Sequence, residues 1–130
     1  MAKEIKETKN ETKPKTAVVK TQPIKIEKMV GEYPLEVQKG EDGSFAIVAV
    51  QAFELRPQAI TGKPTNAKFH EEVAVFLYDR KMLSLMMIPE IIKGELILDM
   101  YNFGLIKLSI PAGTVLSKFH VVKPSKIEIV

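Results

Sequence analysis

From Tyr33 onward, apolar residues occur in short runs that are separated by turn-forming residues, without an amphipathic helical period. The runs are rich in β-branched residues, and Gly, Pro, Asn or Asp recur between them, which is typical of strands joined by tight turns. We expect strands within eight stretches: 33–38, 44–55, 72–78, 82–88, 95–101, 105–110, 114–122 and 126–130. The pattern predicts an all-β domain, either a sandwich, a jelly roll or a partly closed barrel.

Three stretches carry more specific expectations. The segment KGEDGS, between the first two runs, predicts a β-hairpin turn. The apolar run 45–53 predicts a strand that is buried on both faces. In contrast, RPQAITGKPTNAKFH contains Gly62 and Pro64, which interrupt strands, so we expect a loop over 56–70.

The positive charge is concentrated at the N-terminus. Residues 1–30 contain eight lysines and four glutamates, whereas residues 31–130 contain eleven Lys or Arg and twelve Asp or Glu. Pro14 and Pro23 favour extended conformations. The sequence therefore predicts an extended basic arm over 1–30 and a nearly neutral domain over 31–130.

Three interpretations of the arm stay open: a solvated tail, an arm that docks on a partner protein, and nucleic-acid binding. Its lysines alternate with glutamates and it lacks arginines and aromatic residues, which argues against nucleic acid because both charge neutralisation and base stacking would be weak. For protein docking, the candidate contact residues are Lys13, Lys15, Val18, Val19, Ile24 and Ile26.

Several classes of site are not expected. The absence of cysteine excludes disulfides and thiolate zinc sites. His70 and His120 show no metal-ligand spacing, so we expect ordinary histidines, no metal and no cofactor. No apolar run approaches the roughly 18 residues of a membrane helix, and the polar start MAKEIKETKN predicts no secretory signal and no membrane partner.

Residues 91–124 carry a motif that combines several turn positions. It contains Lys93-Gly94-Glu95, a strand that ends at Asn102 and Gly104, and a turn at Pro111-Ala112-Gly113. This segment resembles the C-terminal core of the dUTPase and dCTP deaminase superfamily, with Ile92 in place of an aromatic residue. The resemblance implies a dUTPase-like β-clip, a distorted jelly-roll barrel. Gly94, Asn102, Gly104 and Gly113 are its signature turn residues, which we expect to suit tight turns with positive φ.

The chemistry of that superfamily does not transfer. Where dUTPases carry the carboxylate that activates water, this chain has Pro89, which cannot accept a proton; neighbouring Glu90 would point to the opposite face of the strand. The phosphate-binding stretch is reduced to residues 78–81, and the Gly-rich C-terminal motif is missing. Asp99 aligns with the catalytic Glu of the deaminases. We therefore expect no catalytic and no cofactor-binding residues.

The resemblance also implies a trimer. MLSLMMI, at 82–88, is interpreted as a core strand, a subunit contact, or both, because methionine fills irregular gaps. The expected function is a non-catalytic structural protein, a trimeric virion component such as a phage or viral capsid accessory or decoration protein, whose arm docks on partner subunits. The alternative is a nucleotide-binding protein or a divergent dUTPase- or dCTP deaminase-like enzyme. The expected location is cytoplasmic, or the virion if the protein is viral.

Overall fold

The computed structural model describes residues 23–124 and 128–130, and over these residues the fold consists of strands and turns without a helix. This confirms the prediction of an all-β domain. The strands are β1 (Ile26–Lys28), β2 (Leu35–Lys39), β3 (Phe45–Ala49), β4 (Phe53–Leu55), β5 (Ile60–Phe69), β6 (Ala74–Tyr78), β7 (Leu85–Ile92), β8 (Glu95–Asn102), β9 (Leu108–Ile110) and β10 (Val115–Val122).

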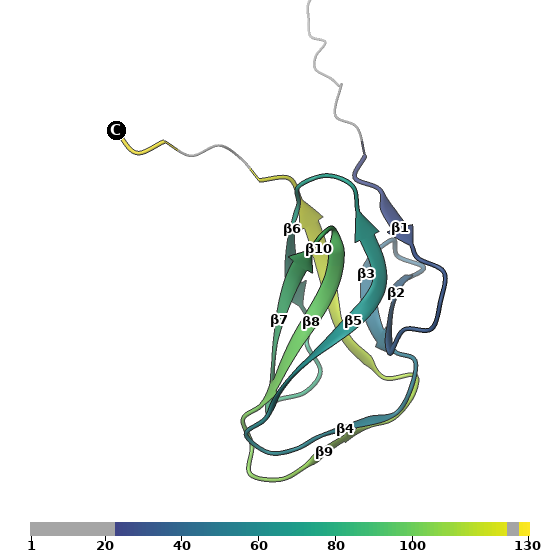
Figure 1. Ribbon diagram of the computed structural model, residues 1–130, viewed down its shortest axis with the longest axis vertical. Helices are drawn as coiled ribbons and strands as arrows, with labels where there is room; N and C mark the ends of the chain where they lie inside the picture. The colour runs from purple at the N-terminus through teal and green to yellow at the C-terminus, as the bar shows by residue number, and fades with distance from the viewer. Residues whose placement is uncertain (1–22, 125–127) are drawn as a thin grey trace, which may run out of the picture.

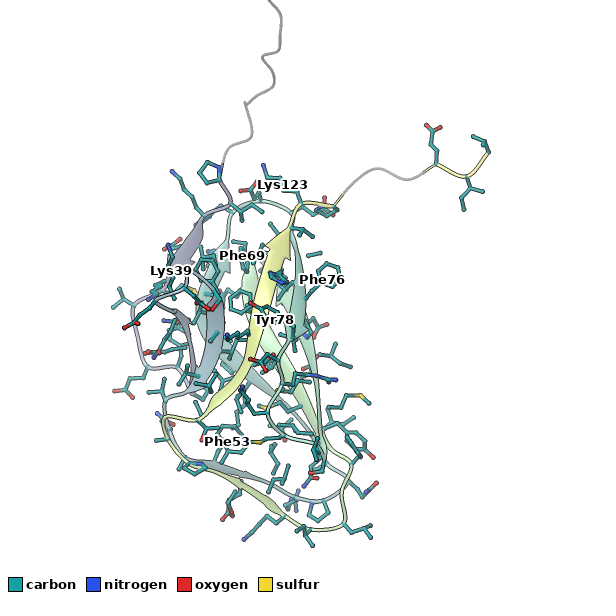
Figure 2. The ribbon with its side chains drawn as sticks, turned by 180° about the vertical axis from the view of Figure 1, so that it is seen from behind. Lys39, Phe53, Phe69, Phe76, Tyr78 and Lys123 are labelled. Atoms are coloured by element: carbon teal, nitrogen blue, oxygen red, sulfur yellow. The ribbon has the colours of Figure 1, made fainter. Side chains whose placement is uncertain are left out.

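One sheet forms most of the molecule and curls into a nearly closed barrel (Figure 1). Its strand order is β6-β10-β3-β2-β5-β8-β7, and β1 pairs with β5 beside this path. The end strands β6 and β7 contact each other without forming a ladder in the described part of the chain. β4 and β9 form a separate two-stranded ribbon at one end of the barrel, where Phe53 lies (Figures 1 and 2).

The core fills the barrel, and β8 shows most clearly how the sequence builds it. Leu96, Leu98 and Met100 are fully buried, whereas the residues between them face outward. This alternation follows from the two-residue period of a strand. The facing side chains of β2, β3 and β10 close the same cluster, including Leu35 and Phe119. The inward-facing side chains of β8 are therefore part of the hydrophobic core, and the outward-facing ones are not.

The expected loop over 56–70 is wrong, because this stretch contains β5, the longest strand. Both supposed breakers lie inside it. Gly62 pairs with Asp99 and Pro64 pairs with Ile97, and the register shifts between Pro64 and Lys68. A bulge is a position at which a sheet tolerates proline, and a glycine suits a site of close approach.

Other strand boundaries also differ from the expected ones. The run 45–53 is divided between β3 and β4, although Ile47 to Ala49 are buried consecutively as expected. β7 continues through Pro89 to Ile92, which an end strand permits because one side of its backbone has no sheet partner. Of the strand expected at 126–130, residues 128–130 are not a strand, and residues 126 and 127 lie outside the described residues.

The boundary of the expected arm is changed by β1. Within the predicted range 1–30, Ile26 to Lys28 are hydrogen-bonded to β5. Ile24 and Ile26 pack against the core of their own domain, so these two candidate contacts contribute to the fold. The other four candidates, Lys13, Lys15, Val18 and Val19, lie outside the described residues.

Two signature glycines have the expected backbone conformation. Lys93 and Gly94 have φ of 53° and 83° and form the two-residue turn between β7 and β8. A Cβ on Gly94 would lie 2.5 Å from the carbonyl oxygen of Phe69, so a side chain is excluded there. Gly113 has φ of 89°.

Asn102 and Gly104 were expected to adopt positive φ in a tight turn, and this expectation is wrong, because neither has positive φ. Asn102 is fully buried at the end of β8. Its Nδ2 donates to the carbonyls of Leu55, at 3.0 Å, and Ile106, at 2.9 Å, while its Oδ1 accepts from the Gly104 N–H at 3.0 Å. One side chain thereby ties the barrel to the β4–β9 ribbon.

The alternation on β8 gives a paired prediction. We expect Leu98→Ala to lower the free energy of unfolding by about 2–5 kcal/mol, because it opens a cavity in the core. Ile97→Ala, one residue away on the outward side, should cost less than about 1 kcal/mol, the range of strand propensity. Denaturant unfolding of both variants checks this, and equal losses would contradict the assigned facing of β8.

Candidate interaction face

The outward side of β5, β8 and β7 forms one continuous surface, which we call the outer face. The register places Ile88 opposite Asp99, Glu90 opposite Ile97, and Gly62 on the other side of Asp99. Side chains that are opposite across a ladder share a face. The outer face is therefore composed of Ile60, Gly62, Pro64, Lys68, Met86, Ile88, Glu90, Ile92, Glu95, Ile97, Asp99 and Tyr101.

Most of these side chains are apolar, and several are open to solvent. The exposed fractions are 73% for Ile60, 54% for Ile88, 49% for Ile92 and 45% for Met86. A single exposed apolar residue is ordinary, but a contiguous group on one flat surface is characteristic of protein–protein contact. The outer face is thus a candidate interaction surface.

Two carboxyl groups lie in the middle of this apolar surface. Glu90 and Asp99 are diagonal neighbours on adjacent strands, since Asp99 is opposite Ile88, two residues from Glu90. A side-chain hydrogen bond with Asp99 raises the pKa of Glu90, with smaller contributions from the negative charge of Asp99 and from desolvation. A cation placed beside the two carboxyl groups would therefore relieve the repulsion that raises the pKa of Glu90.

Gly62 makes room for this arrangement. A Cβ at position 62 would lie 2.9 Å from Oδ1 of Asp99, which is closer than real contacts allow. The glycine that interrupts the apolar pattern of β5 therefore lets the Asp99 carboxyl lie across the neighbouring strand. Among the described residues, no group of three or more His, Asp or Glu is arranged to hold a metal ion.

The residues that the superfamily would use for catalysis do not converge. Pro89 is half-buried opposite Leu98, on the inner side of β7, and Glu90 points outward, as expected from strand alternation. Asp99 lies on the outer face beside Glu90. Around residues 78–81, Asp79 is 3.3 Å from Lys81 Nζ and 3.8 Å from Lys118 Nζ, so this turn brings together charges of both signs.

The two histidines have local partners. His70 forms an ion pair and hydrogen bond with Glu27. His120 stacks on Tyr78 with ring centroids 4.3 Å apart. Both contacts hold neighbouring strands together, because Glu27 lies on β1 and Tyr78 on β6.

A pocket of about 590 Å³ lies beside the Tyr78–His120 stack. Ile24, Ile26 and Phe45 line it, and Asp42 and Ser44 lie at its polar side. Two hydrogen bonds from Ser44, from its hydroxyl and its backbone N–H, lower the pKa of Asp42. The Ser44 hydroxyl donates to a carboxylate and has no base beside it, so this pair stabilises the β2–β3 turn.

Comparisons with protein-family models, curated proteins and solved structures found no match. The fold and the outer face define the class: an all-β, barrel-like domain with an apolar sheet face that its own described residues leave open. In the described residues, no helix has the length and apolar character needed to span a membrane. The similarity to the dUTPase and dCTP deaminase superfamily therefore rests on the sequence pattern at 91–124.

Sequence reasoning found part of this surface and missed its centre. The run at 82–88 indicated a core strand, a subunit contact, or both. Met87 is buried, which confirms the core part, whereas Met86 is exposed and its subunit contact stays a prediction. The Glu90–Asp99 pair was missed because it depends on the register between two strands. The short Lys93-Gly94 turn, which fixes that register, was the available signal.

The carboxyl pair predicts an unusual pH dependence. The folded-state pKa of Glu90 is raised, so its charge destabilises the fold at neutral pH, and this cost disappears as the pH falls through that pKa. In dilute protein we expect Glu90→Gln to raise the melting temperature at pH 7. The gain should vanish at a pH well below 4.5, the ordinary value for Glu.

Glu54→Gln is the matched control, because Glu54 is exposed and lies 3.3 Å from Lys107 Nζ. Its removal should give no gain at neutral pH. If the two variants behave alike across the pH range, the repulsion between Glu90 and Asp99 is refuted.

Proposed function

We propose that this chain is a non-catalytic structural protein that assembles with other subunits as a homotrimer, with its N-terminal arm docked on partner subunits. The observation that carries the proposal is the exposed apolar outer face. A virion is the setting that the fold analogy favours, as an accessory or decoration subunit of a phage or viral capsid.

The energetic support comes from what the outer face would gain when covered. Ile60 and Ile88 are more than half exposed and Ile92 is 49% exposed. Burial of an isoleucine side chain contributes about 1.5–3 kcal/mol relative to full exposure. Pro89 adds to this argument: without its N–H it weakens β7 as a template for further strand pairing. Contact through the face of the sheet is therefore favoured over contact through its edge.

The absence of catalysis in the proposal rests on the inner-facing Pro89 and on the position of Asp99. A general base needs a substrate within hydrogen-bond reach in an enclosed site. Asp99 instead lies on an exposed sheet face with Glu90 beside it. These features support an assembly role over a divergent nucleotide enzyme.

The mass in solution tests assembly. By light scattering, the full chain should have three times the mass of the 14.6 kDa chain. Ile88→Lys should shift this towards the monomer, because it places an ammonium group in the apolar contact. Val30→Lys, at a fully exposed valine outside the outer face, should leave the trimer unchanged. A monomeric wild-type chain, or a trimer unaffected by Ile88→Lys, would contradict the proposal.

Nucleotides separate the two classes of function. A ligand that binds only the folded state at a hundred times its Kd stabilises it by about 2.7 kcal/mol. We expect millimolar dUTP, dCTP and dTTP to leave the melting midpoint of the wild-type chain unchanged. A rise with any one of them would support the nucleotide-binding alternative.

A further inference from the structure

The outer face is apolar with a negative centre, so whatever covers it must match both properties. Ile88 and Ile97 flank Glu90 and Asp99 directly in the register. A purely apolar partner would bury a carboxylate without compensation, which is strongly unfavourable. The occupant must therefore combine apolar side chains with a cation.

We propose that the outer face binds residues 13–20 of a neighbouring copy, with the lysines of that segment placed against Glu90 and Asp99. The segment reads KPKTAVVK: it contains three lysines, two valines and no acidic residue. This inference rests on the proposed function and names the surface that receives the arm.

The charge complementarity is specific to this surface. Within the described residues, the ion pairs that form involve Glu27, Glu54, Glu71, Asp42 and Asp79, and none of them includes Glu90 or Asp99. Of the nearby lysines, Lys63 Nζ lies 4.7 Å above the Phe53 ring, and Lys68 lies beside Gly94 and opposite Glu95, with no ion pair to Glu90 or Asp99 in the described residues. A cation from outside the barrel therefore completes the site.

The spacing of the segment also fits. Residues two apart share a side in an extended chain, so a segment bound in that form would present Val18 and Lys20 to the same surface. Ile88 and Glu90 have the same spacing on β7. A valine against the isoleucine and a lysine against the glutamate would then be satisfied together.

The size of the outer face favours a segment over a second barrel. β7 and β8 each have eight residues, and three such strands span roughly 26 by 14 Å. That area is under half of the roughly 800 Å² per partner in a typical stable interface. An extended segment covers such a strip, and exchange of arms supplies the remaining contact area.

The attachment point permits exchange between copies. β1 begins beside the end of β5, where Ile26 pairs with Phe69 and the Phe69 N–H donates to the Gly94 carbonyl at 2.7 Å (Figures 1 and 2). The arm therefore joins the barrel across β5 from the tip of the β7–β8 hairpin. Lys20 precedes Ile26 by six residues, and six extended residues reach about 20 Å. Head-to-tail contacts of this kind close into a ring when the rotation allows it.

The absence of cysteine makes disulfide trapping a clean test. We would mix full-length Val18→Cys with isotopically labelled full-length Ile88→Cys, oxidise the mixture, and identify linked chains by mass. The proposal predicts a labelled–unlabelled disulfide in several-fold higher yield than the same mixture with Val30→Cys in place of Ile88→Cys. Adding Glu90→Gln and Asp99→Asn to the Ile88→Cys chain should reduce this yield to the control level.

Three results would overturn the inference. Equal yields at positions 88 and 30 would remove the outer face as the docking surface. An unchanged yield after neutralisation of both carboxyls would remove the role of the lysines. A disulfide that forms only within one chain, in the Val18→Cys/Ile88→Cys double variant, would show that the arm covers its own barrel.

The solution mass distinguishes this failure from failure of the proposed function. If the chain is trimeric but the 18–88 disulfide does not form, assembly stands and the assigned occupant is wrong. If the chain is monomeric at every concentration, both the proposed assembly and the assigned occupant are contradicted.

Discussion

The structure depends on one constraint: both sides of the β7–β8 hairpin carry apolar side chains, and the barrel buries only one side. Leu96, Leu98 and Met100 fill the core completely. The intervening residues Ile97 and Asp99 face outward, as do Met86, Ile88 and Ile92 on β7. Since strand side chains alternate strictly, the sequence cannot move the second set inward without exposing the first. The outer face is therefore a fixed consequence of the register.

Buried and outward polar groups play different parts in this fold. Asn66 accepts from the Val37 N–H, Thr65 donates to the Leu96 carbonyl, and Asn102 bridges three backbone groups. These side chains are hydrogen-bonded to the backbone of other segments and hold the barrel together. Glu90 and Asp99 instead interact with each other on an outward surface, where they contribute repulsion. This pair therefore does not stabilise the fold as the buried polar groups do.

The sequence was sufficient for the fold class and for several turns, and the reasons are local. Alternation and β-branched residues marked most strands, and Lys93-Gly94 marked the hairpin that organises the outer face. β5 was missed because Gly62 and Pro64 look like loop residues until their neighbours are known: one accommodates Asp99 and the other lies at a bulge. Asn102 was assigned to a turn, whereas its side chain acts across the fold. The conformation of β5 and the role of Asn102 both depend on contacts with segments distant in the sequence, which the local pattern does not reveal.

The central claim is that the outer face is covered when the protein assembles, and carbene footprinting of the full chain at rising concentration tests it most directly. The account predicts that labelling of Met86, Ile88 and Ile92 falls as concentration rises, while Leu83 and Val30, which are almost fully exposed elsewhere, stay labelled. Labelling of all five in constant proportion at every concentration would contradict it.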